Sequence, residues 1–240
     1  MARFILPGQG GAHAVGVTPP VYYFDDFVEG GYNATTTTDG AKFSTLANAA
    51  PWLVSLVDSL TGSAETMIVD DVGQGGHLAV TTNAADNDST SAQLNGASFI
   101  NHATNKLIFE CRFKVDDILT TDWAVGMSAP SGSLIGANNL MVFTSADSTG
   151  DVDIRTNLAG SAELLDTGVD LVNDTFVTVR LEATTTKIEW FVDGSLEITS
   201  TDTDDIPILD LSPGFTVRVD GTGGAEVLTI DYIMVAQERA

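Results

Sequence analysis

The strongest constraint on the fold of this chain is a regular alternation of apolar and polar residues within short runs. In the clearest run, residues 106–115, apolar side chains occupy every second position and charged side chains occupy most of the others. A period of two is typical of a β-strand that buries one face and exposes the other. Cys111 lies on the apolar side, so we expect its thiol to be buried in a core and unreactive.

Similar runs recur along the chain, and clusters of Gly, Asn, Asp and Ser separate them. Residues 176–183 and 187–193 predict an antiparallel hairpin, and Asp193-Gly194 supplies the positive-φ turn into a strand at 195–199. In residues 228–234 the side chains of Leu228, Ile230, Tyr232 and Met234 alternate, which predicts a core strand. Further strands are expected at 22–28, 66–69, 77–82, 91–94, 123–127, 140–144, 152–156 and 215–219. Residues 51–60 fit a helix or a strand equally well. This rhythm predicts an all-β fold, an antiparallel β-sandwich, rather than alternating strands and helices.

Length and composition predict one globular domain. The chain has 240 residues, 43% of them hydrophobic, and a mean hydropathy of +0.14, which suits a single sandwich and not a disordered acidic chain. Residues 1–20 mix Gly and Pro without a period, so we expect an extended N-terminal arm there and the sandwich over 21–240. One cysteine excludes an intramolecular disulfide. The apolar run 4–6 is too short for a signal peptide, and no apolar run is long enough for a membrane helix, which predicts synthesis in the cytoplasm.

The balance of charge limits the partners. Ten Lys and Arg stand against 33 Asp and Glu, giving a formal net charge of -23. Such a surface repels phosphate backbones and anionic lipid, so we expect neither nucleic acid nor a membrane as a partner. Solubility alone is an equally simple explanation of the charge.

Four stretches occur in an order that resembles the concanavalin A-like (laminin-G-like) jelly rolls. They are residues 23–27 (Tyr-Phe-Asp-Asp-Phe), 75–81 (Gly-Gly-His-Leu-Ala-Val-Thr), 188–194 (Ile-Glu-Trp-Phe-Val-Asp-Gly) and 229–237 (Thr-Ile-Asp-Tyr-Ile-Met-Val-Ala-Gln). The resemblance covers about residues 22 to 238 and implies a jelly-roll sandwich. Within this fold the chain is most similar in composition, and in its N-terminal arm, to virion structural proteins of tailed bacteriophages, particularly capsid decoration (cement) proteins.

The chemical motifs argue against catalysis. Glycoside hydrolases of this fold resemble one another in a Glu-x-Asp-x-Glu triplet on one strand, and this sequence contains no such triplet. Glu189 and Asp193 share strand parity, but Asp193 belongs to the expected turn. We therefore expect no catalytic residues and no enzyme. A glycosidase remains the third alternative, because carboxylates from different strands can meet only in the folded chain.

Evidence for a cofactor is confined to acidic loops. Asp202, Asp204 and Asp205 offer the hard oxygen ligands that Ca²⁺ prefers, and we expect no other cofactor. His13, His77 and His102 lack metal-ligand spacing. Trp190 is expected in the core, whereas Trp52 and Trp123 fit either the core or a platform for a sugar ring.

These observations predict a non-catalytic capsid decoration protein. Its expected partner is a major capsid protein on the outer surface of the virion, and symmetric sites on a shell favour a homotrimer. The arm residues expected to contact the partner are Arg3, Phe4, Ile5, Leu6 and Pro7. The alternative is a carbohydrate-binding module of a virion or cell-surface adhesin, in which loops at one rim hold sugar beside Ca²⁺.

Overall fold

A computed structural model describes residues 21–27, 33–36, 42–43, 52–57, 65–70, 76–95, 99–145, 149–221 and 224–238. The expected arm over residues 1–20 lies outside these ranges, and its boundary with the sandwich stays a prediction. Regular structure in the described residues is entirely β-strand. Among the same residues there is no helix with the length and apolar character needed to cross a membrane.

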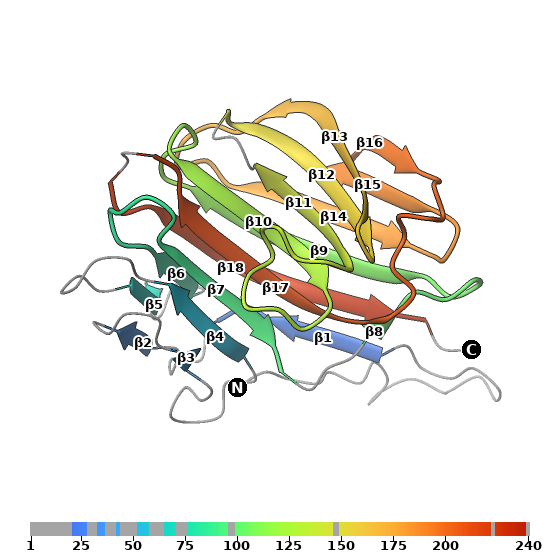
Figure 1. Ribbon diagram of the computed structural model, residues 1–240, viewed down its shortest axis with the longest axis horizontal. Coiled ribbons are helices and arrows are strands. Elements are labelled where there is room, and N and C mark those ends of the chain that lie inside the picture. The colour runs from blue at the N-terminus through green and yellow to red at the C-terminus, as the bar shows by residue number, and fades with distance from the viewer. Residues whose placement is uncertain are drawn as a thin grey trace.

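The strands form two antiparallel sheets, which we call sheet A and sheet B (Figure 1). Sheet A runs in the order β16 (Ser195–Ser200), β15 (Ile188–Val192), β14 (Val177–Ala183), β9 (Leu107–Val115), β18 (Val227–Gln237), β6 (His77–Thr81), β5 (Glu65–Asp70) and β2 (Asn33–Thr36), and β1 (Val21–Asp25) also pairs with β18. Sheet B runs in the order β13 (Ser161–Asp170), β12 (Asp151–Leu158), β11 (Leu140–Ser145), β10 (Thr121–Ser128), β17 (Asp210–Val219), β7 (Ser89–Leu94), β4 (Trp52–Val57) and β3 (Lys42–Phe43), and β8 (Phe99–Ile100) pairs with β17.

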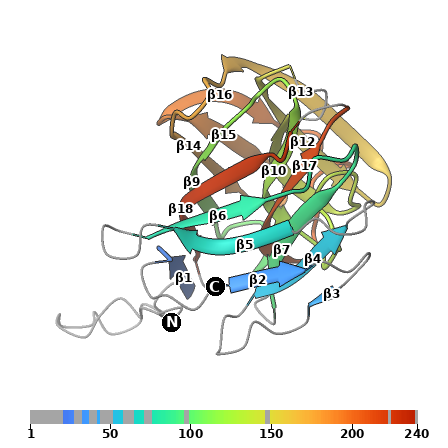
Figure 2. The same cartoon turned by 90° about the vertical axis from the view of Figure 1, so that its left-hand side faces the viewer.

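This architecture confirms the predicted antiparallel β-sandwich of jelly-roll type. Figure 2 shows the two layers from the side, with β18, β6 and β5 in one layer and β17, β7 and β4 in the other. The predicted hairpin is formed by β14 and β15. At the turn into β16 both Asp193 (φ 47°) and Gly194 (φ 82°) have the left-handed backbone that this two-residue turn requires. The described part of 51–60 is the strand β4.

The core lies between the sheets and is rich in aromatic side chains. Cys111 and Trp190 are fully buried, as expected, and so are Trp52 and Trp123. Phe113 packs against Trp123 with ring centroids 4.8 Å apart, and Phe143 meets Trp190 edge-on at 5.0 Å. Trp52 and Trp123 therefore belong to the core, because a buried indole cannot stack on a bound sugar ring.

A buried carboxylate joins the two sheets at β1. Asp25 accepts hydrogen bonds from the Trp52 indole of sheet B and from the Tyr23 hydroxyl, both at 3.1 Å, and from the backbone amide of Phe27 at 3.1 Å. A buried carboxylate is stable only when such donors replace its water shell. The stretch 23–27 thus has a structural role, since it fastens the first strand of sheet A to β4.

Candidate functional site

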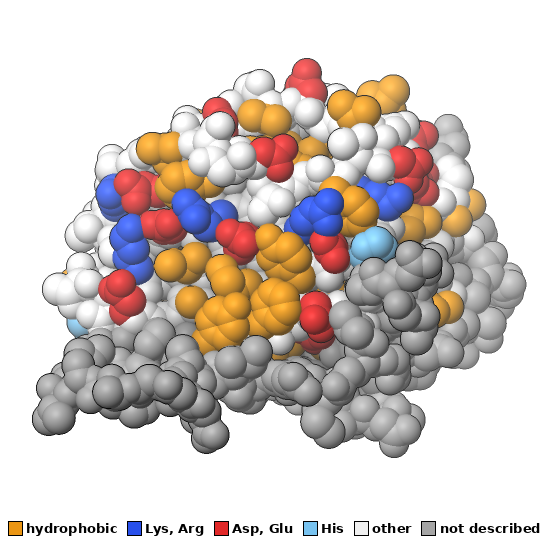
Figure 3. Space-filling model, turned by 180° about the vertical axis from the view of Figure 1, so that it is seen from behind, with side chains coloured by type: hydrophobic (Ala, Val, Ile, Leu, Met, Phe, Trp, Pro, Cys, Tyr) orange, Lys and Arg blue, Asp and Glu red, His pale blue; other side chains and the backbone are white. Residues whose placement is uncertain are grey.

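The outer face of sheet A, the face turned away from the core, carries a belt of ion pairs. Five of the ten Lys and Arg side chains lie on or beside this face, and each is within ion-pair distance of a carboxylate. The pairs are Lys106–Glu182, Arg112–Asp231, Lys114–Asp174, Arg180–Glu182 and Lys187–Glu189. Figure 3 shows the belt as basic and acidic side chains in alternation. Because each basic group has an acidic partner, the face carries little net charge although the chain carries -23.

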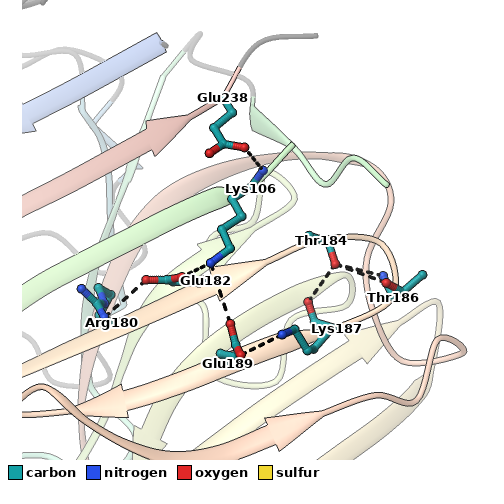
Figure 4. Close-up of polar contacts among 8 residues, drawn as sticks. All are labelled: Lys106, Arg180, Glu182, Thr184, Thr186, Lys187, Glu189 and Glu238. Carbon is teal, nitrogen blue, oxygen red and sulfur yellow. Dashed lines mark hydrogen bonds and ion pairs between the residues drawn. The ribbon is translucent and has the colours of Figure 1, made fainter. Parts of the chain in front are cut away.

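The densest part of the belt surrounds two glutamates (Figure 4). Glu182 on β14 and Glu189 on β15 are directly opposite each other, a position that places Cβ atoms about 4.5–5.5 Å apart. The ammonium group of Lys106 donates to Glu182 and lies 3.9 Å from Glu189 Oε2, while Lys187 Nζ donates to Glu189 at 2.7 Å. The hydrogen bond from Lys187 lowers the pKa of Glu189, and the hydrogen bond to Glu182 raises the pKa of Lys106.

Cations contact both carboxyl groups of this glutamate pair. Two carboxyl groups about 5–5.5 Å apart can cleave a glycosidic bond when one of them is protonated and acts as the general acid. Glu182 lies between two cations, since Arg180 Nη2 is 3.3 Å from its second oxygen. Lys187 likewise pairs with Glu189, so both carboxyl groups belong to the network of ion pairs in the belt.

A β-bulge in β18 changes which side chains this strand directs to the outer face of sheet A. The register with β9 shifts between Ile230 and Tyr232, so Asp231 and Tyr232 both point to the outer face. Tyr232 donates its hydroxyl hydrogen to Glu110 Oε1 at 2.7 Å, and Asp231 pairs with Arg112. Partial burial, together with the hydrogen bond to Glu110, raises the pKa of Tyr232, so the phenol remains protonated. The expected core positions of Tyr232 and Met234 are thus wrong, because the bulge moves both to the outer side.

Next to the belt, half-buried apolar side chains from three neighbouring strands form a continuous surface, which we call the apolar patch. Its members are Tyr22 and Phe24 on β1, Tyr232, Met234 and Ala236 on β18, and Ile108 on β9. The rings of Tyr22 and Phe24 are near-parallel at 12° with centroids 6.4 Å apart, and those of Phe24 and Tyr232 are 30° and 5.8 Å apart. Hydrophobic side chains gather below the charged belt in Figure 3. Sequence reasoning does not find the patch, although two stretches that carry the family resemblance, 23–27 and 229–237, contain part of it.

At the end of the belt away from Glu182 and Glu189, basic side chains surround the ring of Phe176. The Arg112 guanidinium lies 4.3 Å from the ring centroid, Lys114 Nζ lies 5.6 Å from it, and the His77 ring lies 5.1 Å away. Contacts of a cation with an aromatic face at these distances are attractive. Phe176 and Asp231 together fix the position of Arg112 beside the apolar patch.

The central part of the outer face of sheet B is covered by the chain itself. Residues 129–139, which we call the covering loop, join β10 to β11 and lie in front of β17 in Figure 1. Leu134 of this loop is buried against Ala124, Leu140 and Val142. A Cβ atom added to Gly214 on β17 would lie 3.0 Å from the Leu134 side chain, so the glycine provides the space that Leu134 fills.

Polar contacts fasten the covering loop to the sheet. Gln93 Nε2 donates to the carbonyl oxygens of Ser128 and Ala129 at 2.9 and 3.2 Å, and Gln93 Oε1 accepts from the Ser131 amide at 2.9 Å. The Leu134 amide donates to Thr216 Oγ1 at 2.9 Å. The hydrogen-bonding groups of Gln93 and Thr216 are therefore occupied by partners within the chain itself.

Two carboxylates outside the belt, Glu226 and Asp116, have raised pKa values and a structural role. Glu226, at the start of β18, accepts hydrogen bonds from Thr120 and Thr121 at 2.9 Å each, and Asp116 accepts from the backbone amide of Val227 at 2.8 Å. Burial raises the pKa of Glu226 and of Asp116. Glu226 is only 2% exposed, so a substrate cannot reach its carboxyl group.

The structure describes only some of the site residues that the sequence predicts. Arg3, Phe4, Ile5, Leu6 and Pro7 lie outside the described residues. Asp202 accepts the backbone amide of Asp204 at 3.0 Å, and Asp205 is buried whereas the other two are exposed. Within the described ranges no group of three or more His, Cys, Asp and Glu side chains could hold a metal ion. The binding of Ca²⁺ at Asp202, Asp204 and Asp205 stays a prediction.

Solved structures of other proteins share this fold, although their sequences differ widely from this one. No protein-family model matches the sequence, and no curated protein is similar to it in sequence. An endo-1,3-β-glucanase from Streptomyces sioyaensis is similar in structure with a TM-score of 0.59 and 15% identity, covering 97% of this chain and 100% of that one. The laminarinase from Rhodothermus marinus gives a TM-score of 0.59 and 17% identity over 92% of this chain and 99% of that one. A protein of unknown function from Shewanella oneidensis MR-1 gives 0.57 and 15% over 95% and 92%.

These findings correct the functional expectation from the sequence. The chain was expected to be a non-catalytic capsid decoration protein, and that prediction is wrong, because the structures it matches over nearly their full length include endo-1,3-β-glucanases. The concanavalin A-like jelly roll itself is confirmed. The capsid partner, the trimer and the virion location were inferred from that prediction, and each of them stays an untested prediction.

Proposed function

We propose that this chain is a carbohydrate-active protein and that the polysaccharide on which it acts is a β-linked glucan. The observation that carries the proposal is the match to an endo-1,3-β-glucanase and to a laminarinase over nearly the whole length of this chain and of each of those chains. A fold alone does not define a function, so the residues of this chain must supply the rest of the argument.

The residues suit a neutral polysaccharide. The outer face of sheet A combines side chains that donate and accept hydrogen bonds with an apolar surface, and its charges are matched. Sites for small polar ligands share this composition, with apolar contact area and a few placed polar groups. A net charge of -23 disfavours a polyanionic glycan, since like charges repel at long range.

A binding assay with a cleavage readout tests the proposal. The full chain is mixed with a soluble 1,3-β-glucan, with a mixed-linkage β-glucan, and with an α-linked glucan as the control polymer. We expect saturable binding to the β-glucans and none to the α-glucan. New reducing ends in the same samples report whether bound glucan is also hydrolysed. Absence of binding to both β-glucans, with the chain shown to be folded by its thermal transition, would contradict the proposal.

A further inference from the structure

We propose that the apolar patch on sheet A, with the polar side chains that border it, is a binding surface for the pyranose rings of a glucan chain. This assignment rests on the proposed function and adds to it the part of the molecule that contacts the polysaccharide. It places the contact on the face opposite to the one that the covering loop occupies.

The first argument is the arrangement of the rings. A pyranose ring has two apolar faces of C–H groups and a periphery of hydroxyl groups, so it packs its face on an aromatic ring. Tyr22, Phe24 and Tyr232 provide three neighbouring rings whose planes differ by 12° and 30° in successive pairs. All three residues are half-buried, so part of each remains in contact with solvent. Aromatic side chains offer this contact area at low cost in conformational entropy because they have only two rotatable bonds.

The second argument is the polar border. Glu110 and Arg112 on β9 stand beside Tyr232, and the bulge in β18 brings Asp231 to the same side. Their partners hold these groups in place before a ligand arrives: Glu110 accepts from the Tyr232 hydroxyl, and Arg112 is fixed by Asp231 and Phe176. Carboxylate oxygens and guanidinium N–H groups can then accept from and donate to the hydroxyls at the edge of a bound sugar. Bulges in sheets are frequent beside binding sites because they redirect side chains in this way.

The third argument is electrostatic, and it distinguishes a sugar from other occupants. A second copy of this chain would bring another charge of -23 to the contact, and an anionic membrane would meet the same repulsion. A strongly basic partner would find the carboxylates beside the patch already engaged, Asp231 with Arg112 and Glu110 with Tyr232. A neutral ligand rich in hydroxyl groups matches an apolar surface whose bordering charges are internally paired.

Direct binding measurements on matched variants test this assignment. The probe is a linear hexamer of β-1,3-linked glucose, and its dissociation constant is measured for the wild-type chain, for Tyr22→Ala/Phe24→Ala and for Leu164→Ala. Leu164 lies on β13 of sheet B and is 55% exposed, so it controls for the loss of an exposed apolar side chain elsewhere. We expect the double variant to bind at least about tenfold more weakly, the loss typical of removing aromatic anchors from a contact. We expect the control to stay within about twofold of wild type, as surface changes usually do.

The outcomes separate the assignment from the function on which it rests. If the wild-type chain binds the hexamer and the double variant binds it equally well, the patch is not the contact surface, while the proposed function stands. If the wild-type chain binds no β-glucan, the proposed function fails and the assignment fails with it. If sedimentation shows a dimer that the double variant dissociates, the patch is an interface between copies and the assignment is overturned.

A measurement on the unmodified protein removes the risk that the double variant does not fold. Hydroxyl-radical oxidation of the wild-type chain is compared with and without saturating hexamer. We expect slower oxidation of Tyr22, Phe24 and Met234, and unchanged oxidation of the exposed Leu119 and Leu164. Unchanged oxidation of the patch with hexamer bound, or protection confined to other residues, would overturn the assignment whatever the variants do.

Discussion

The outer faces of the two sheets are built by the same alternation of side chains and yet meet different surroundings. On sheet A the outward side chains of β9, β14 and β15 are half-exposed and mostly charged. On sheet B the outward side chains of β10, β17 and β7 lie almost entirely out of water, beneath the covering loop or beside Arg218. Alternation therefore tells which side chains point away from the core, whereas the connections between strands decide whether those side chains reach solvent.

Residue size explains why the loop covers only one of the faces. Ala124 and Gly126 on β10 and Gly214 on β17 leave little side-chain volume above the centre of sheet B, and Leu134 occupies the space that remains. The corresponding area of sheet A carries Glu110, Arg112 and other long side chains. A buried leucine packed against a surface of small residues excludes water and gains contact area, which a surface of ion pairs does not allow.

The largest expected difference between the faces concerns two arginine–aspartate pairs. Arg218 pairs with Asp122 on sheet B, where the Asp122 side chain is 0% exposed, and Arg112 pairs with Asp231 on sheet A, where both partners remain in contact with water. We expect Arg218→Leu to lower the free energy of unfolding by about 3–5 kcal/mol, because it removes the guanidinium from a buried carboxylate. We expect Arg112→Leu to lower it by about 1 kcal/mol or less, as for other exposed pairs.

Urea unfolding of both variants measures this difference, with the slope of the transition checked against wild type. The double variants Arg218→Leu/Asp122→Asn and Arg112→Leu/Asp231→Asn serve as controls. The Arg218→Leu/Asp122→Asn variant should recover much of the stability that Arg218→Leu loses, because the buried negative charge is removed as well. The Arg112→Leu/Asp231→Asn variant should differ little in stability from wild type. Equal losses for the two arginine variants would contradict the contrast between the faces.

The second prediction concerns the covering loop. Leu134→Ala should destabilise the chain by about 2–3 kcal/mol, since it removes a buried side chain and leaves a cavity above Gly214. Hydrogen exchange at the amides of Ser131 and Leu134 should become about tenfold faster or more, because the hydrogen bonds of these amides to Gln93 and Thr216 open with the loop. Leu164→Ala, on an exposed position of β13, should change stability by less than about 0.5 kcal/mol. Unchanged exchange at both loop amides would show that Leu134 does not hold the loop.

The sequence could predict those strands whose two faces differ in environment. Runs such as 106–115 and 176–183 alternate because one side meets the core and the other meets water, and both are strands with alternating burial. The Asp193-Gly194 turn is recognisable because its backbone conformation restricts the residues that can form it. By contrast, β13 has no alternation to detect, because most of its side chains are exposed on both sides.

The candidate site could not be predicted for a related reason. The bulge in β18 depends on the hydrogen-bond register with β9, which the sequence of one strand does not contain, so Tyr232 and Met234 were assigned to the wrong face. The apolar patch unites residues more than 200 positions apart in the chain, since Tyr22 on β1 lies opposite Ala236 on β18. Nothing in the composition of the covering loop indicates that Leu134 packs over Gly214.

The smallest expected effect compares one carboxylate from each sheet through its response to pH. On sheet B, Asp151 and Asp170 face each other across β12 and β13, and the hydrogen bond with Asp151 and its charge raise the pKa of Asp170. On sheet A, Lys187 lowers the pKa of Glu189. As pH falls, Asp170 should therefore take up its proton above the usual Asp value of about 3.9, and Glu189 below the usual Glu value of about 4.3.

The two shifts have opposite consequences for stability. Between the unfolded and the higher folded pKa of Asp170 the folded state binds the extra proton, so this group makes the fold more stable as pH falls. The stabilisation from ionised Glu189 is present above the unfolded pKa and disappears as pH falls through the lower folded pKa. Asp170→Asn should accordingly raise the melting temperature slightly at pH 7 and not at pH 3, whereas Glu189→Gln should lower it slightly at pH 7 and not at pH 3. Carboxyl carbon chemical shifts in a pH titration measure both pKa values directly. If Asp170 titrated at a lower pH than Glu189, the predicted contrast between these two carboxylates would be contradicted.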